Sequence, residues 1–324
     1  MQPLRQSILD MEAIMSVADI YEKRATFSFE VFPPKTDVGM EKLCGKDGVL
    51  DKLYTLEPDY ISCTYGAGGT NVGKNLEVLD KIQKDGKTIP VTHFTCIGNT
   101  KEDIKEKLQT YLDHGIDHML ALRGDIPFGW TGTNGDLHYA TELVKFVRKE
   151  FGQKFTIAVA GSPEGHIACR SIEADISFLK QKQDEGADYI MTQLCWDMDQ
   201  FRWWMDAIRG AGIWLPVDVG IMPVLDAAAT INMALSRNGC VMPRALSEII
   251  SKHWIFPNPF APNESEESIA NKKAAFKEAG MEYPIKLIDE YRVAGIDGIH
   301  LYALNKYEDV TRLVKESGIM DYVD

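Results

Sequence analysis

The chain has 324 residues and a mass of 36.4 kDa, with 35 basic and 48 acidic residues and a formal net charge of −13. This length suits one large domain or two small ones. A content of 45% hydrophobic and 26% charged residues is typical of a globular protein and excludes a wholly disordered chain. The acidic balance argues against nucleic acid or an anionic membrane as the main partner, although a local basic pocket suffices for a small anion.

The six cysteines form no Cys-x-x-Cys pair, and we predict reduced thiols in a cytoplasmic protein. The first 16 residues lack the apolar core of a signal peptide, and no apolar run approaches the length of a membrane span. No spacing typical of a metal site occurs, nor a Walker A loop or a dinucleotide-binding glycine motif after a strand. We therefore expect no metal, no membrane partner and no nucleic-acid partner.

Eight short β-rich runs recur along the chain, each followed by a polar loop and then by a segment of helical periodicity. They cover residues 26–32, 60–66, 90–96, 118–124, 155–161, 189–194, 215–223 and 298–304. Most begin about 26–37 residues after the previous run, which is the length of one βα unit with a helical crossover. Because most runs are almost continuously apolar, we expect parallel strands that are buried on both faces.

This pattern predicts an α/β fold, namely a (β/α)8 TIM barrel in a single domain over residues 1–324. A doubly wound open sheet is the alternative. We predict an N-terminal helical extension over residues 1–25. The long gap before the last run contains a segment rich in Pro, Asn, Ser and Glu, and we predict a surface insertion at about 253–275.

Two of the segments between strands show clear helical faces. Ile104 and Leu108 share one face of the segment that follows the third strand, and Thr100 is the expected N-cap. In the aromatic segment 201–208, four residues share a face that we expect to pack against the core: Phe201, Trp204, Met205 and Ile208.

Polar residues gather near the ends of the predicted strands, where a (β/α)8 barrel carries its active site. They are Glu30, Thr64, Tyr65, His93, Arg123, Asp125, Ser162, Glu164, His166, Gln193, His300, Tyr302 and Lys306. Polar residues scattered through a core would not cluster in this way. We therefore place the active site at the carboxyl ends of the strands.

Glu30 is the leading candidate for a catalytic acid, because a carboxyl group in an apolar strand is costly to ionise and can retain a proton to donate. The alternative is a structural carboxylate paired with a buried Arg or Lys. Asp125 is a candidate to balance a developing positive charge or to bind a ligand, and its alternative is a salt bridge with Arg123. His93 is either a ligand-binding residue or a core histidine.

Several segments, in order and over about residues 26–306, resemble methylenetetrahydrofolate reductases of the bacterial single-domain type. They include FSFEVFPPKT, ISCTYGAGG, THFTC, LALRGD, DEGADYIMTQL and HLYALN. The resemblance implies a TIM-barrel flavoprotein that reduces 5,10-methylenetetrahydrofolate to 5-methyltetrahydrofolate. Hydride would pass from NAD(P)H to FAD, or alternatively FMN, and then to the folate one-carbon unit.

The resemblance also implies the roles of individual residues. Glu30 would be the general acid, and Asp125 would bind the pterin and stabilise its cation. The implied flavin-binding residues are Thr64, Tyr65, Ala67, His93, Arg123, Gly124, Asp125, Tyr139, Ala140, Ser162, His166, Asp175 and Lys182. The implied substrate-binding residues are Glu30, Asp125, Gln193, Tyr302 and Lys306. Arg123 and Lys182 would offset the pyrophosphate charge.

Two positions depart from the family pattern. Ser162 stands where the family often has a tyrosine beside the flavin, and Ala227 stands where it often has an aromatic residue that stacks on nicotinamide. We therefore expect weakened use of NADH and an electron-donating protein partner, as in a multi-protein reductase complex. A folate-binding methyl-transfer barrel without redox chemistry is a further alternative, and we also expect a homo-oligomer.

Overall fold

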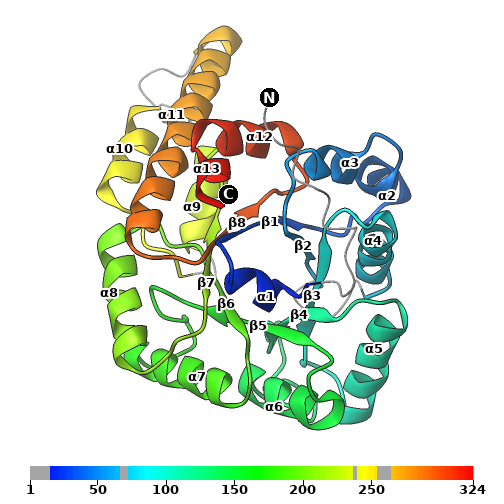
Figure 1. Ribbon diagram of the computed structural model, residues 1–324. Helices are drawn as coiled ribbons and strands as arrows, with labels where there is room; N and C mark the ends of the chain where they lie inside the picture. The colour runs from blue at the N-terminus through cyan, green and yellow to red at the C-terminus, as the bar shows by residue number, and fades with distance from the viewer. Residues whose placement is uncertain (1–14, 66–71, 236–238, 254–263, 324) are drawn as a thin grey trace.

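The computed structural model describes residues 15–65, 72–235, 239–253 and 264–323. Eight parallel strands form a closed barrel in chain order, and helices surround it (Figure 1). The strands are β1 (Thr26–Val31), β2 (Tyr60–Cys63), β3 (Ile89–Thr95), β4 (His118–Leu122), β5 (Thr156–Gly161), β6 (Tyr189–Thr192), β7 (Val217–Ile221) and β8 (Gly298–Tyr302). The predicted TIM barrel is confirmed, and pairing of β1 with β8 excludes the open sheet.

Several strands end earlier than the β-rich runs predict. β4 stops at Leu122 and β7 at Ile221, so that the last residues of both runs belong to loops at the carboxyl rim. At the end of β4 the reason is local, because Gly124 adopts a φ of 90°, a left-handed conformation that glycine adopts without strain. At this end of β4, the residues that leave the ladder are Arg123 and Gly124, which the sequence places in the site.

The helices alternate with the strands, as the periodicity predicts. They are α1 (Val17–Tyr21), α2 (Asp37–Cys44), α3 (Val49–Tyr54), α4 (Val72–Asp85), α5 (Lys101–Asp113), α6 (Ala140–Phe151), α7 (Ile172–Asp184), α8 (Met198–Gly210), α9 (Ala227–Leu235), α10 (Arg244–Lys252), α11 (Glu266–Val293), α12 (Tyr307–Glu316) and α13 (Ile319–Val323). Thr100 caps α5 as predicted, in a reciprocal capping box with Asp103. Ile104 and Leu108 are buried on its inner face.

Two apolar clusters hold the barrel together. The larger one lies between the strands and the surrounding helices, and the smaller one fills the barrel interior with Tyr60, Val91, Leu120, Ala158, Tyr189 and Met191. Val17 of α1 joins the smaller cluster, and its backbone N–H donates to His118 Nε2 at 3.1 Å. Helix α1 therefore closes the amino-terminal end of the barrel and leaves the carboxyl end for the site.

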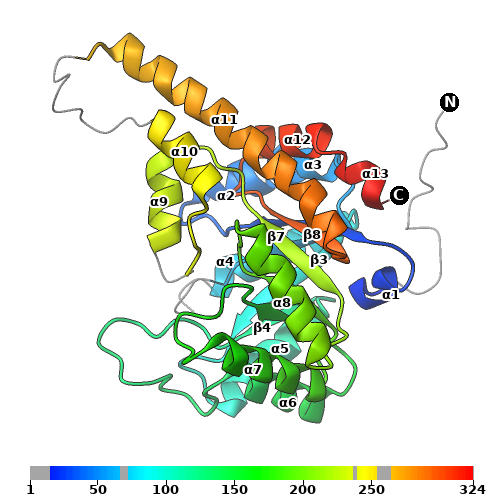
Figure 2. The ribbon, with the colours of Figure 1, turned by 90° about the vertical axis from the view of Figure 1, so that its left-hand side faces the viewer.

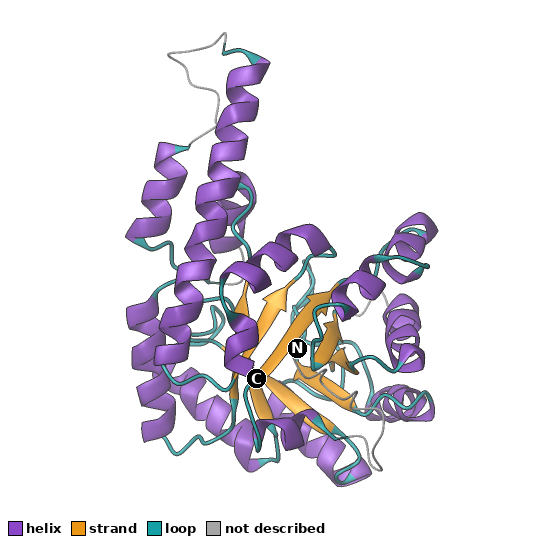
Figure 3. Cartoon of the chain, turned by 45° about the horizontal axis from the view of Figure 1, so that its top comes forward, coloured by secondary structure: helices purple, strands orange, loops and turns teal. Residues whose placement is uncertain are grey.

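The connection from β7 to β8 is longer than the others and contains α9, α10 and α11. Helix α11 projects past the barrel in two views (Figures 2 and 3). Of the insertion expected at about 253–275, residues 254–263 lie outside the described part, and the described remainder includes the first turns of α11. Of the N-terminal extension, only residues from 15 onward are described. Both assignments, and the single-domain division, stay predictions.

No helix in the described ranges combines the length and the apolar character that crossing a membrane requires. Within the same ranges, no group of three or more His, Cys, Asp or Glu side chains is arranged to hold a metal ion.

Asp218 of β7 is a buried carboxyl group at the closed end of the barrel. Its Oδ2 accepts hydrogen bonds from the hydroxyls of Tyr21 at 3.0 Å and Thr26 at 3.2 Å, and from that of Tyr60. Its Oδ1 has no hydrogen-bond partner among the described residues. Burial raises the pKa of Asp218 to about 6, although the charge of His300 and the three hydroxyls oppose the shift.

The raised pKa of Asp218 predicts a pH-dependent loss of stability. Between an unfolded-state pKa of about 4 and a folded-state pKa of about 6, the folded protein binds more protons, so stability falls as pH rises. Asp218→Asn should lack this loss of about 3 kcal/mol between pH 4 and 7, as measured by chemical denaturation across that range. The exposed Asp199→Asn is the control, and an unchanged pH dependence in Asp218→Asn would contradict the assignment.

Candidate active site

Glu30 lies near the carboxyl end of β1 and is buried, with 9% of its surface exposed. Its Oε2 lies 3.5 Å from His93 Nε2 on β3 and 3.7 Å from His300 Nε2 on β8. In the described part of the chain, these two imidazoles are its ion-pair partners, and no Arg or Lys is among them. The alternative of a carboxylate paired with a buried Arg or Lys therefore does not match the geometry.

Two serine hydroxyls complete the cluster around Glu30. Ser62 Oγ lies 3.3 Å from both His93 Nε2 and His300 Nε2, and Ser28 Oγ lies 2.7 Å from His300 Nδ1. Burial lowers the pKa of His93, although the charge of Glu30 opposes the shift. His93 is therefore a neutral imidazole at neutral pH, and it lies beside Glu30 and Ser62.

Five of the residues predicted to bind flavin lie close enough to interact electrostatically. The backbone N–H of His166 donates to Asp175 Oδ2 at 3.2 Å. Burial lowers the pKa of His166; Asp175 and Asp125 oppose this shift, whereas Arg123 and Lys182 reinforce it. The loops after β4 and β5 and the helix α7 thus bring both basic residues and their acidic counterparts to one place on the rim.

The same region fits the donor set that a flavin requires. Thr95 Oγ1 is buried at the end of β3 without a hydrogen-bond partner among the described residues. Tyr65 instead packs against Phe94 in the larger apolar cluster, with ring centroids 5.4 Å apart. A Cβ at Gly124 would lie 2.5 Å from Ile97 Cγ2, so only glycine allows the chain to pass there. Lys182 donates to the Ala160 carbonyl at 2.9 Å, and burial lowers its pKa. Ala67 lies outside the described residues.

Asp125 is exposed in the loop after β4 and forms no ion pair with Arg123 in the described part of the structure. Arg123 Nε instead donates to the carbonyl of Gly124 at 3.1 Å. The alternative of an intraloop salt bridge is therefore not observed, and the Asp125 carboxylate faces solvent at the barrel mouth. Tyr139 is 61% exposed at the start of α6, where Ala140 is the first helical residue.

The residues predicted to bind substrate are only partly gathered. Tyr302 pairs in register with Glu30, and its hydroxyl donates to the Thr192 carbonyl at 3.0 Å. Gln193 follows directly after β6, and its Oε1 accepts from the Leu194 backbone N–H at 2.8 Å. Lys306 is exposed at the start of α12 and forms no part of the buried cluster.

Ser28 and Ser62 belong to the cluster but have no role in the sequence-based assignment, and His300 has only a place on its strand there. A signal for them exists, because residues two apart on a strand face the same side. Ser28 therefore faces the barrel interior with Glu30, as does His300 with Tyr302. Which of these rings meet across the barrel depends on the strand register, which no local pattern specifies.

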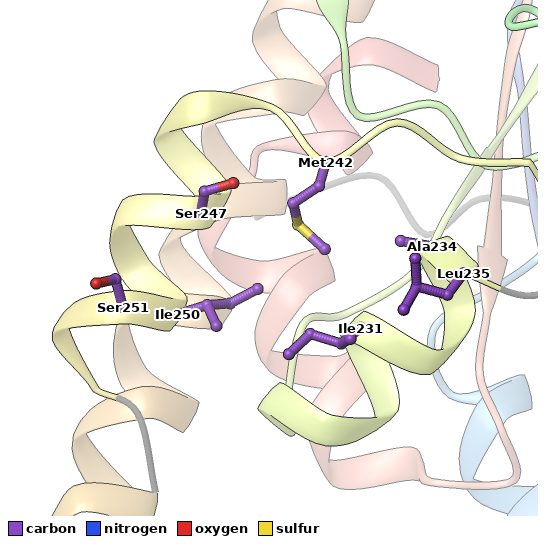
Figure 4. A pocket seen from close by; sticks show the side chains of 7 residues that line it. All are labelled: Ile231, Ala234, Leu235, Met242, Ser247, Ile250 and Ser251. Carbon is purple, nitrogen blue, oxygen red and sulfur yellow. The ribbon is translucent and has the colours of Figure 1, made fainter. Parts of the chain in front are cut away.

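Two surface grooves lie away from Glu30. One of about 560 Å³ lies between α9 and α10 (Figure 4) and is lined by Ile231, Ala234, Leu235, Met242, Ser247, Ile250 and Ser251. The other, of about 460 Å³, is lined by Glu164, Ile172, Glu173, Asp197, Gln200, Trp203 and Val241. Glu164 accepts from the Val241 backbone N–H at 3.0 Å, and burial raises its pKa to about 7. Neither groove includes Glu30.

Comparison with known proteins agrees with this architecture. A solved structure of an uncharacterized protein from Clostridium thermocellum, described as binding two copies of 5-methyl-5,6,7,8-tetrahydrofolic acid, shares the fold. Its TM-score is 0.60 at 14% identity, covering 94% of this chain and 98% of that one.

Curated relatives align over almost the whole chain. The 5,10-methylenetetrahydrofolate reductase of Pectobacterium carotovorum is 30% identical over 90% of both chains. Methylenetetrahydrofolate reductase (NADH) 1 of Arabidopsis thaliana is 31% identical over 96% of this chain and 51% of its own length. The chain spans about half the length of the eukaryotic relatives that it matches. The family model for methylenetetrahydrofolate reductase matches residues 14–318, and the chain therefore belongs to the methylenetetrahydrofolate reductase family.

Proposed function

We propose that the protein reduces 5,10-methylenetetrahydrofolate to 5-methyltetrahydrofolate, with Glu30 as the proton donor. The observation that carries the proposal is the buried Glu30 carboxyl beside two imidazoles at the carboxyl end of a barrel of this family. The bacterial relatives, which align along most of both chains, carry the name of this activity.

The reaction requires a proton at one nitrogen of the substrate and stabilisation of a cation at the other. Glu30 would give its proton to folate N10 as the bond from N10 to the bridging carbon breaks, which opens the five-membered ring and leaves an iminium cation at N5. The exposed carboxylate of Asp125 would lie against that cation and stabilise it. A bound flavin would supply the hydride that the bridging carbon then accepts.

The flavin would be held by the residues that the structure gathers around His166. Arg123 and Lys182 supply positive charge toward a pyrophosphate, and the unpartnered hydroxyl of Thr95 supplies a hydrogen bond. A buried hydroxyl without a partner is costly, so a polar ligand that reaches Thr95 would gain binding energy. FAD is our first choice of flavin and FMN the second.

The electron donor is the part of the proposal in which this chain departs from its family. Ala227 begins α9 and offers no aromatic face for nicotinamide, and Ser162 offers none for the flavin. We therefore propose that an electron-donating protein partner supplements or replaces NADH, although the name of the Arabidopsis relative includes NADH. The homo-oligomeric state and the cytoplasmic location stay predictions from the sequence.

The purified protein is expected to be yellow, and acid release should identify its flavin as FAD or FMN. Under anaerobic conditions, a low-potential reductant should bleach the flavin absorbance at least about ten-fold faster than NADH, because Ala227 has no aromatic ring to stack on the nicotinamide. Methylenetetrahydrofolate should then restore the absorbance in stopped-flow measurements.

Two outcomes separate the alternatives. Rapid bleaching by NADH would contradict the proposed partner while leaving the reductase activity intact. Folate binding to a protein without flavin absorbance would favour a methyl-transfer barrel without redox chemistry. The control is Ala227→Phe, which should accelerate bleaching by NADH without changing the rate with the low-potential reductant.

A further inference from the structure

The imidazole of His300 is buried beside Glu30. Only 1% of His300 is exposed, and its ring stacks on that of Tyr60, with centroids 5.6 Å apart and an interplanar angle of 16°. Its two nitrogens have different neighbours. Nδ1 contacts Ser28 Oγ at 2.7 Å, whereas Nε2 faces Ser62 Oγ at 3.3 Å and Glu30 Oε2 at 3.7 Å.

The hydrogen bonds of Ser28 and Ser62 determine which nitrogen of His300 carries the proton. Ser28 Oγ donates its only proton to the Ile299 carbonyl at 3.4 Å, so it accepts from His300 Nδ1–H. In the neutral ring Nε2 then presents a lone pair. Ser62 Oγ lies 3.3 Å from Nε2 of both rings; with its proton donated to His93 Nε2, the lone pair of His300 Nε2 stays open to another donor.

The other titratable groups near Glu30 do not offer it a hydrogen-bond acceptor. Tyr302 and Cys63 interact electrostatically with Glu30, and burial raises the pKa of both well above the usual range, so both stay neutral. His93 Nε2 lies 3.5 Å from Glu30 Oε2, but its lone pair accepts from Ser62 in this arrangement. Asp218 interacts with His300 from the closed end of the barrel but bonds to Tyr21, Tyr60 and Thr26.

We propose that His300 is a positioning residue whose Nε2 lone pair accepts a hydrogen bond from protonated Glu30 and so retains the proton that the reaction consumes. The 3.7 Å separation lies beyond hydrogen-bond length, and a movement of roughly 1 Å by the carboxyl group closes it. The proposal rests on the proposed function only for the destination of the proton. The arrangement of His300 and Glu30 itself is a property of the chain.

The direct test is the pH titration of the Glu30 carboxyl carbon by NMR in protein labelled with ¹³C at glutamate, the signal being assigned by its loss in Glu30→Gln. In His300→Asn the amide can replace Nδ1 toward Ser28 but not Nε2 toward Glu30. In this variant, the titration midpoint of the Glu30 carboxyl should fall by about one pH unit, which is the equivalent of one lost hydrogen bond. His300→Gln, which places an amide at the Nε2 position, should retain most of the wild-type midpoint.

Two further variants protect the test against misfolding and general effects. Ser28→Ala removes the acceptor for Nδ1–H, frees the other tautomer to donate to Glu30, and should also lower the midpoint. His118→Asn replaces a buried histidine that bonds to Val17 and not to Glu30, so it should leave the midpoint unchanged. An unchanged or higher midpoint in both His300→Asn and Ser28→Ala would overturn the proposal, since a rise would mean that His300 acts as a cation.

The kinetic test separates this inference from the proposed function. His300→Asn should slow methylenetetrahydrofolate reduction about ten-fold and shift its pH profile in parallel with the NMR midpoint, while flavin reduction is unchanged. If the wild-type protein fails to reduce methylenetetrahydrofolate, the proposed function fails, and the NMR titration still decides the inference about His300.

Discussion

Glu30→Gln is expected to lower the rate of methylenetetrahydrofolate reduction by about 10²–10⁴-fold, the usual contribution of a general acid. The amide retains the size of the side chain but has no acidic proton to give to folate N10. Flavin content and the rate of flavin reduction by a low-potential donor should stay at wild-type values. Single-turnover stopped-flow measurements of flavin reoxidation by methylenetetrahydrofolate check this expectation.

The matched control is Glu164→Gln at the same end of the barrel. Glu164 is half-buried, and burial raises its pKa to about 7, but its carboxylate accepts from the Val241 backbone and lies in a groove that does not include Glu30. An amide oxygen preserves that hydrogen bond, so folate turnover should change less than about three-fold. Full folate turnover in Glu30→Gln would disprove the acid assignment.

Trp204→Ala is expected to produce a large loss of stability, about 3–5 kcal/mol of unfolding free energy. Trp204 is 1% exposed on the inner face of α8 and packs at 5.9 Å between ring centroids from Phe201. A Cβ at Gly161 of β5 would lie 3.1 Å from Trp204 Cζ2, so the indole fills the space that this glycine leaves. Removing it therefore opens a cavity between helix and barrel.

Trp214→Ala provides the control for this loss. Trp214 is 72% exposed after α8, and its replacement should change the unfolding free energy by less than about 0.5 kcal/mol. Denaturant titrations of both variants at one pH make the comparison. Equal losses of unfolding free energy in the two variants would contradict the prediction that the inner face of α8 packs against the barrel.

Much of the fold follows from local patterns. The apolar runs and their spacing identify all eight strands, and the shared face of Phe201, Trp204 and Ile208 identifies the buried side of α8. Thr100 predicts the start of α5, because the capping box is encoded within four residues. Strand ends are less well predicted. The β-rich run 118–124 continues past the last strand residue, Leu122, because the positive φ of Gly124 takes the chain out of the sheet.

Only part of the candidate site was predictable from the sequence. Glu30 is identifiable from the sequence because a carboxyl group in an apolar strand is costly to ionise and therefore unusual. The family resemblance implies its role. The alternative for Asp125, a salt bridge with Arg123, is not formed, because Arg123 turns to the Gly124 carbonyl. Ala67 falls outside the described residues, and Lys306 lies at the surface, where no burial fixes its position.

The sequence by itself determined the parallel barrel, the end of it that carries the polar residues, and the family to which they belong. These properties depend on periodicity, spacing and motifs, which are local. Only the tertiary structure decided that His93, His300, Ser28 and Ser62 surround Glu30, and that α1 closes the opposite end through Tyr21 and Asp218. The contacts of Glu30 and Ser28 with His300 join strands at opposite ends of the chain, and their geometry depends on barrel closure between β1 and β8.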